Sequence, residues 1–161
     1  GDAAKAHVPL VGAHRIEGVE VLVAQGRTPM GSAFAMARQW LEDKELVPSR
    51  AYRPVLVLVS DGEPTDDWQE PLAALKASER GQKATRFAMA IGADADRAML
   101  RQFTNDLEAP VFEADGVRDI VKFFRAVTMS VMARSTSGSP NTAQPLGMSD
   151  DLEDDLDLDA L

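Results

Sequence analysis

Apolar strands and amphipathic helices alternate along the chain from residue 55 onward. Five apolar residues in a row, 55–59, predict a strand buried on both faces, as in a parallel sheet. Two further apolar runs, 85–92 and 109–113, predict the next strands. Apolar residues at helical spacing follow the strands in three groups: Trp68, Leu72 and Leu75; Met99, Leu100 and Phe103; and Val117, Ile120, Val121, Phe124, Val127 and Val131. This alternation predicts an α/β fold with a three-layer, doubly wound, mostly parallel sheet and helices on both faces.

Upstream of residue 55 the pattern is more varied. Residues 3–10 and 18–24 predict two short strands, the second from its β-branched residues and partial alternation. A turn with a glycine at each end, residues 26–31, then opens a helix that the apolar spacing carries to about residue 43. Thr28 is the expected N-cap of this helix, and Pro29 is its expected first residue.

Acidic residues mark the starts of two later helices. The pair Asp66 and Asp67 suits the N-terminus of the helix near Trp68, because the helix dipole stabilises carboxylates there. Asp94 or Asp96 is expected at the N-terminus of the helix that follows the 85–92 strand, where the helix dipole likewise stabilises a carboxylate.

Composition excludes several classes of protein. The 161 residues, 45% of them hydrophobic, are enough for one domain with a real core. No apolar run reaches the length of about 18 residues that a membrane span needs, and no basic-then-apolar leader is present. The chain has no cysteine, so a disulfide framework and a thiolate metal site are excluded. These features favour a cytoplasmic location without a membrane partner.

The net charge of -9 is concentrated at the end of the chain. Residues 150–161 hold seven acids and no base, and without them 19 acids face 17 lysines and arginines. No basic stripe occurs, so a nucleic-acid partner is not expected. Residues 135–149 have the composition of a Ser/Pro/Gly linker, and the acidic tail at 150–161 is predicted to be disordered.

The tail also carries leucines between its acids, at Leu152, Leu156, Leu158 and Leu161. One interpretation is simple solvation of a charged tail. The alternative is a short acidic and hydrophobic segment that docks in a groove or on a basic surface of a partner.

Two polar residues at element junctions are the candidate ligands of a metal. Thr28 lies in the turn that opens the first helix, and Asp61 follows the 55–59 strand. In open α/β sheets ligands bind outside the carboxyl ends of the strands, and hydroxyl and carboxylate oxygens suit Mg²⁺, Mn²⁺ or Ca²⁺. Ser60, Glu63 and Asp66 are candidates for the rim or the outer shell of the same site. The structural alternatives are a helix cap for Thr28 and a turn for Asp61.

The two segments that hold these residues resemble the von Willebrand factor type A domains. The carriers of the resemblance are Gly26-Arg-Thr-Pro-Met-Gly31 and Val55-Leu-Val-Leu-Val-Ser-Asp-Gly-Glu-Pro-Thr-Asp-Asp-Trp68, within residues 3–137. The sequence is most similar to the bacterial TerY-like branch, which is linked to tellurite resistance. The resemblance implies a Rossmann-like fold and a metal-ion-dependent adhesion site. There Thr28 and Asp61 match two of the family's ligands to Mg²⁺, and an acidic group of a partner completes the coordination.

The sequence departs from the family pattern before Thr28. No Asp-x-Ser-x-Ser loop occurs there, and the family's first strand, first helix and second strand are not recognisable. Residues 1–134 are therefore expected to form a partial, N-terminally truncated domain, either as a fragment or as a degenerate domain. With two of the five protein ligands, this chain is expected to bind the metal weakly or not at all.

The resemblance implies a non-enzymatic, metal-dependent module for protein–protein interaction in a bacterial tellurite or chemical stress response. It also implies a serine/threonine kinase and a metal-dependent phosphatase as partners. Two alternatives stay open. One is a Mg²⁺-dependent α/β hydrolase or phosphotransferase that uses Asp61, although no phosphate-cradling glycine loop is present. The other is an acidic adaptor that works through its C-terminal tail.

Overall fold

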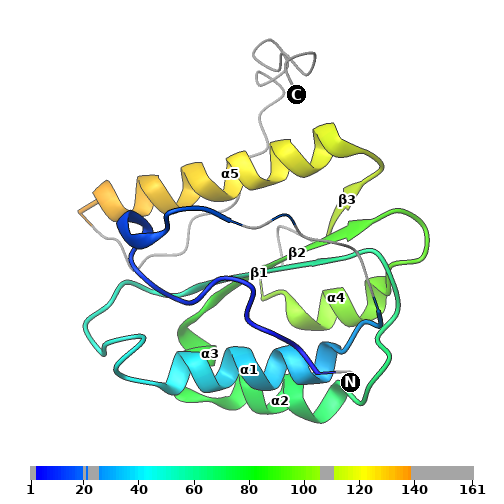
Figure 1. Ribbon diagram of the computed structural model, residues 1–161, viewed down its shortest axis with the longest axis horizontal. Coiled ribbons are helices and arrows are strands. Elements are labelled where there is room, and N and C mark those ends of the chain that lie inside the picture. The colour runs from blue at the N-terminus through cyan, green and yellow to red at the C-terminus, as the bar shows by residue number, and fades with distance from the viewer. Residues whose placement is uncertain (1–2, 20, 22–25, 106–110, 139–161) are drawn as a thin grey trace.

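The computed structural model describes residues 3–19, 21, 26–105 and 111–138. This part of the chain contains three strands and six helical segments, and Figure 1 shows how they are arranged. In chain order they are the short 3-10 helix η1 (Ala13–Arg15), α1 (Met30–Glu42), β1 (Val55–Ser60), α2 (Gln69–Ala77), α3 (Glu79–Lys83), β2 (Thr85–Ile91), α4 (Arg97–Phe103), β3 (Phe112–Ala114) and α5 (Val117–Thr136).

The three strands form one parallel sheet in the order β1-β2-β3. Val55 to Ser60 pair with Thr85 to Ala90, and β2 pairs with β3 from Met89 opposite Phe112 onward. All three strands therefore end at the same edge of the sheet, which is where ligands bind in such folds. The predicted α/β class and parallel sheet are confirmed.

Helices cover both faces of the sheet. In Figure 1, α5 lies over one face, while α1, α2 and α4 lie on the other. Ala88 and Ala90 of β2 pack into the core cluster of α1, α2 and α4. Phe87 and Met89, which alternate with them, pack into a second cluster with α5. This alternation along one strand is how a two-sided core forms, and it confirms the predicted helices on both faces.

β1 is less buried than its sequence predicts. The side chains of Val55 to Val59 are half-buried, and only Ser60 is buried, whereas six of the seven residues of β2 are buried. Within the described ranges β1 pairs with β2 alone. The prediction that 55–59 is fully buried is therefore wrong in degree, because a strand at the edge of a sheet keeps one side accessible.

The strand predicted for residues 3–10 is also wrong. The structure shows bends and irregular backbone there. Proline at position 9 offers no N–H to a ladder, and the N–H of Ala4 donates instead to Ser32 Oγ at 2.8 Å. In the 18–24 prediction, Val19 and Val21 are exposed and not in a strand, and the other residues from 20 to 25 lie outside the described part.

α5 is longer than predicted. It runs through Thr136, so Ser135 and Thr136 belong to this helix and not to the predicted linker. The rest of the 135–149 linker beyond residue 138, and the acidic tail, lie outside the described residues. In the part of the chain that the structure describes, no helix is both long enough and apolar enough to cross a membrane.

Candidate functional site

A hollow of about 580 Å³ opens beside the carboxyl end of β1. It is lined by the turn before α1, by the end of β1 and by the start of the chain, including Thr28, Ser60 and Asp61. The structure therefore brings together the two predicted metal ligands, which are 33 positions apart in the sequence.

Thr28 lies beside the turn that carries Asp61. A Cβ atom placed on Gly62 would be 3.7 Å from Thr28 Oγ1, so the hydroxyl is in van der Waals reach of that turn. The backbone carbonyl of Thr28 accepts hydrogen bonds from the N–H groups of Met30 and Thr65, both at 2.9 Å. The bond from Thr65 fixes the Thr28 turn to the segment that follows Asp61.

Thr28 is not the N-cap of α1. Pro29 occupies that position, with no hydrogen bond from a cap side chain, and Met30 is the first helical residue. The predictions for Thr28 and Pro29 are each wrong by one position. The reason lies in Asp66, which takes over the role of the cap.

Asp66 caps the N-terminus of α1 from a distance of more than thirty positions in the sequence. Its Oδ1 accepts from the N–H of Gly31 at 2.8 Å, and its Oδ2 accepts from the N–H of Ser32 at 2.9 Å. One carboxylate thereby satisfies two of the N–H groups that have no partner within the helix, and it lies at the positive end of the helix dipole. The sequence predicts that Asp66 stabilises the N-terminus of the helix near Trp68. That assignment is wrong, but Asp66 does stabilise a helix N-terminus through the helix dipole, namely that of α1.

Gly31 makes this close approach possible. A Cβ atom at position 31 would lie 2.2 Å from the carbonyl oxygen of Asp67, which is inside the van der Waals contact distance. Glycine is therefore required where α1 meets the Asp66–Asp67 backbone. The second glycine of the 26–31 turn and the acids after Asp61 thus form one interlocked unit, which sequence spacing alone does not show.

Ser60 shapes the turn that presents Asp61. Its side chain is buried, and its Oγ donates to the carbonyl of Gly62 at 3.1 Å and lies 3.4 Å from the Gly62 N–H. Asp61 is exposed, and its carboxylate makes no hydrogen bond or ion pair with any described residue. The site therefore presents a carboxylate to solvent on a turn whose backbone is held by the hydrogen bond from Ser60 to Gly62.

Of the remaining predicted residues, those that the structure describes do not line the hollow. Glu63 is exposed one position beyond the turn. Asp96, and not Asp94, caps α4, since its Oδ1 accepts from the Met99 N–H at 2.9 Å. The backbone N–H of Asp96 also reaches the carbonyl of Gly62 at 3.4 Å, which ties this cap to the Asp61 turn. Leu152, Leu156 and Leu158 lie outside the described residues.

The chemistry of this donor set fits a hard divalent cation in kind but not in number. Thr28 Oγ1 and the Asp61 carboxylate are oxygen ligands of the type that Mg²⁺ prefers. Among the described residues, however, no group of three or more acidic, histidine or cysteine side chains is arranged to hold a metal. Most of the coordination sphere of a cation here would consist of water or of groups from another molecule.

Sequence reasoning missed two buried charges at the opposite end of the sheet, Arg86 of β2 and Arg134 of α5. Arg86 of β2 is buried and donates to the carbonyls of Phe103 and Gly81, each at 2.7 Å. Burial lowers the pKa of Arg86, although the group stays charged at neutral pH. Its two carbonyl partners show that it ties β2 to the middle of α3 and to the end of α4, and it lies away from the hollow. The signal in the sequence that could have identified Arg86 is its position within the apolar run 85–92.

The sequence profile of the von Willebrand factor type A domain matches residues 14–126. The matched range includes the Thr28 turn, the Asp61 turn and the whole three-stranded sheet. No curated protein and no solved structure matches the chain at a significant level.

Proposed function

Because this chain belongs to the von Willebrand factor type A family, we propose that it is a non-enzymatic module for protein–protein interaction that binds its partner at the hollow around Thr28 and Asp61. Domains of this family are in general interaction modules. The observation that supports the location is the position of Thr28 Oγ1 beside the Asp61 turn, in a hollow open to solvent.

The proposed interaction depends on a divalent cation, Mg²⁺ or in its place Mn²⁺ or Ca²⁺. Thr28 and Asp61 would hold the ion, with water in the other positions and an acidic group of the protein partner completing its coordination. The cation then supplies a positive charge that attracts this acidic group. Two protein ligands give weak binding by the chain alone, so the partner contributes much of the affinity for the ion.

The outer residues have supporting roles in this proposal. Asp66 holds the Thr28 turn in place through α1, and the bond from Ser60 to Gly62 fixes the base of the Asp61 turn. Glu63, which is exposed two positions beyond Asp61, would add negative charge near the ion. None of these three needs to touch the metal for the site to form.

We extend the proposal to a biological setting on the similarity of the motifs alone. The TerY-like character of residues 26–31 and 55–68 favours a bacterial, cytoplasmic role in a tellurite or chemical stress response. The partners would be a serine/threonine kinase and a metal-dependent phosphatase. The near-balanced charge outside the tail supports a protein partner over a nucleic acid.

Titration of the ¹⁵N-labelled full chain with Mn²⁺ tests the metal site directly. Paramagnetic Mn²⁺ broadens the amide signals of nearby residues, and we expect Thr28, Asp61 and Gly62 to lose intensity first. Weak binding with two protein ligands corresponds to a dissociation constant in the millimolar range, on the order of 4 kcal/mol of binding free energy. Asp61→Ala should remove the selective loss.

Asp67→Ala is the matched control, because Asp67 is also exposed and lies in the same acidic segment. If Asp67→Ala removed the broadening as completely as Asp61→Ala, the ion would be bound by general negative charge, and the proposed site would be wrong. Micromolar affinity that Asp61→Ala abolished would contradict the weak binding but support the location.

A further inference from the structure

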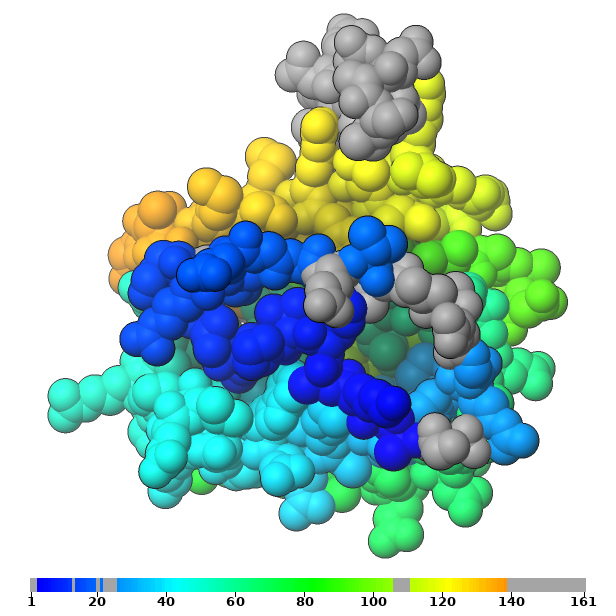
Figure 2. Space-filling model, viewed as in Figure 1, coloured from blue at the N-terminus to red at the C-terminus, as the bar shows by residue number. Residues whose placement is uncertain are grey.

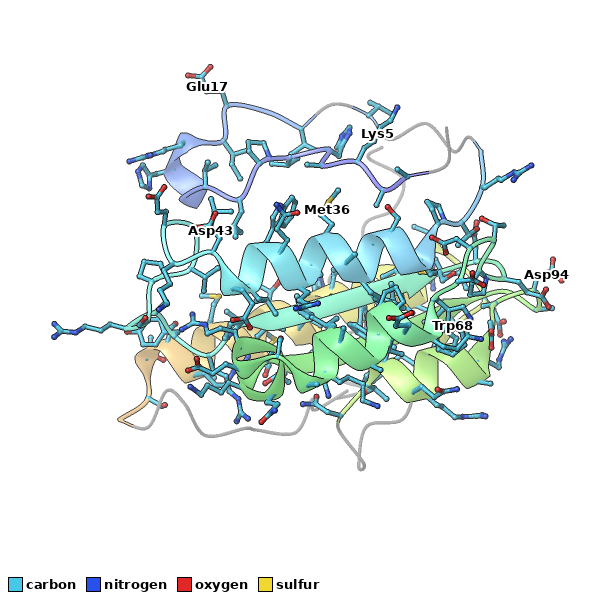
Figure 3. All side chains as sticks on the ribbon, turned by 90° about the horizontal axis from the view of Figure 1, so that it is seen from below. Lys5, Glu17, Met36, Asp43, Trp68 and Asp94 are labelled. Carbon is cyan, nitrogen blue, oxygen red and sulfur yellow. The ribbon has the colours of Figure 1, made fainter. Side chains whose placement is uncertain are left out.

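A second and larger hollow lies between the N-terminal segment, residues 4–15, and α1. This apolar groove has a volume of about 1,120 Å³. Its floor includes Met36 and Trp40 of α1 and Val55 and Leu56 of β1. Figure 2 shows the dark blue N-terminal segment lying across this face of the molecule, and in Figure 3 Met36 points from α1 toward that segment.

The groove continues into a basic hollow at the start of β1. This smaller space, about 280 Å³, shares Ala51, Tyr52 and Pro54 with the groove. Arg53, Arg80 and Lys83 line it, and no acidic residue does. Arg80 Nε is buried and has no hydrogen-bond partner. The surface as a whole is therefore apolar along α1 and positively charged at one end.

The end of α5 lies at this basic end. Arg134 Nη1 donates to Thr85 Oγ1 at 3.2 Å, and the N–H of Thr85 donates to the carbonyl of Pro54 at 2.9 Å. Pro54 lines both hollows. Between residue 138 and the acidic tail stand residues 139–149, a stretch that can span roughly 36 Å when extended. The tail therefore starts within reach of the groove.

The tail has the composition that this surface fits. From Asp155 to Ala160 acids and apolar residues alternate, so an extended backbone would place Leu156 and Leu158 on one side and three aspartates on the other. A segment with one apolar side fits an open groove better than a position inside the sheet, where both sides are buried. Its acids complement the charge of Arg53 and Arg80 at the entrance, while the third basic side chain there, Lys83, is already paired with Glu79 at 3.0 Å.

We propose that the acidic, leucine-containing tail, residues 150–161, docks in the groove between the N-terminal segment and α1 of its own chain. Leu156 and Leu158 lie against Met36 and Trp40, and the aspartates face the basic hollow and solvent. Docking covers the half-exposed side of β1 that the fold leaves accessible. The groove and the metal-site hollow share Ala4, Lys5 and Ala33, so a docked tail lies beside the proposed partner site.

A nitroxide on Ala160→Cys tests this docking in the full chain. The chain has no cysteine, so this label is unique. We expect about a twofold or larger loss of amide intensity for Met36, Trp40 and Leu56, because an intramolecular segment is present at a high effective concentration. The loss should return to background in the double variant Leu156→Ser/Leu158→Ser, which changes only the tail.

Two methionine variants locate the contact. Met36→Gln in the groove should at least halve the broadening, while Met132→Gln on the exposed face of α5 should leave it unchanged; Met132 is 61% exposed and matches Met36 in size. Broadening of Phe124 and Met132 in place of the groove residues would overturn the proposal, and so would the absence of any selective loss.

Mixing distinguishes a second copy as the source of the tail. Spin-labelled chain without ¹⁵N is added to ¹⁵N-labelled chain without the nitroxide, and we expect no loss of intensity in the mixture. A loss seen in the mixture and not in the singly labelled dilute chain would mean that the tail docks on another molecule. This test does not involve a metal, so its failure leaves the proposed metal site untouched.

Discussion

Asp61 and Asp66 lie five positions apart in the same acidic motif, yet the structure uses them in opposite ways. The carboxylate of Asp66 is bound by two backbone N–H groups at 2.8 and 2.9 Å and fixes the start of α1. The carboxylate of Asp61 is exposed and has no partner among the described residues. One acid holds the fold together, and the other is available to a ligand.

The difference between Asp61 and Asp66 bears on how the family-specific motif at residues 61–68 is interpreted. The motif contains both functions, and the acid with the structural role, Asp66, is not the one nearest the strand end. Asp66 and Gly31 place the Thr28 turn against the Asp61 turn, so the candidate site depends on a contact that neither residue makes with a ligand. Variants that separate the two functions are the sharpest way to test this division.

The largest effect is expected from Gly31→Ala. Its Cβ would meet the carbonyl oxygen of Asp67 at 2.2 Å, so α1 and the acidic segment must move apart. Overpacking of this kind costs about 3 kcal/mol, and the shift also breaks the bonds from Asp66 to the helix. Urea unfolding should show the loss. A cost below about 0.5 kcal/mol would show that the backbone of Asp67 moves away from position 31 easily. The contact between Gly31 and Asp67 would then not position the site.

Asp66→Ala is expected to cost about 2 kcal/mol, at the upper end of the range for a lost helix cap. Two backbone N–H groups at Gly31 and Ser32 lose their acceptor, and the helix dipole loses its counter-charge. Asp66→Asn keeps one acceptor oxygen and should cost about half as much. Thermal unfolding of the two variants side by side checks the ranking. Equal stability of Asp66→Ala and wild type would remove the distinction from Asp61.

Much of the fold was predictable from the sequence because its signals are local. The runs that became β1 and β2, and the spacing that became α1, α4 and α5, each reflect burial on one or two faces of an element. The predicted strand at 3–10 failed because a strand needs a neighbour, and the Ala4 N–H bonds to Ser32 Oγ. The prediction that β1 is fully buried failed for a related reason, since the run Val55–Val59 contains no information about which strand pairs with it.

The candidate site was predictable in part. Thr28 and Asp61 were found from their positions at element junctions, and the hollow contains both. The cap of α1 was assigned to Thr28 because caps usually come from the adjacent residue. The true cap, Asp66, follows the strand after the helix, and a contact over that separation has no periodic signature. The requirement for Gly31 was equally hidden, since it comes from the backbone of Asp67.

Gly62→Ala should have a small effect although Gly62 lies in the most specific part of the motif. A Cβ there has its nearest neighbour, Thr28 Oγ1, at 3.7 Å, which is an ordinary contact. Its backbone is not among the positive-φ glycines of the described residues, Gly26 and Gly92, so alanine adds no backbone strain. We expect a change in unfolding free energy within about 0.5 kcal/mol. A loss as large as that of Gly31→Ala would mean that the Asp61 turn is as tightly packed as the Asp66 contact.

The smallest effect on the metal-free protein is expected from Asp61→Ala. The carboxylate makes no bond to a described residue, so in EDTA the unfolding free energy should change by less than about 0.5 kcal/mol. Mg²⁺ should then separate the two proteins. With a millimolar affinity, 10 mM Mg²⁺ stabilises the wild type by about 1 kcal/mol, because the ion binds the folded chain, and it leaves Asp61→Ala unchanged. Equal stabilisation of both proteins by Mg²⁺ would mean that Asp61 does not hold the ion. A large loss of stability in EDTA would instead show that Asp61, like Asp66, belongs to the structural half of the motif.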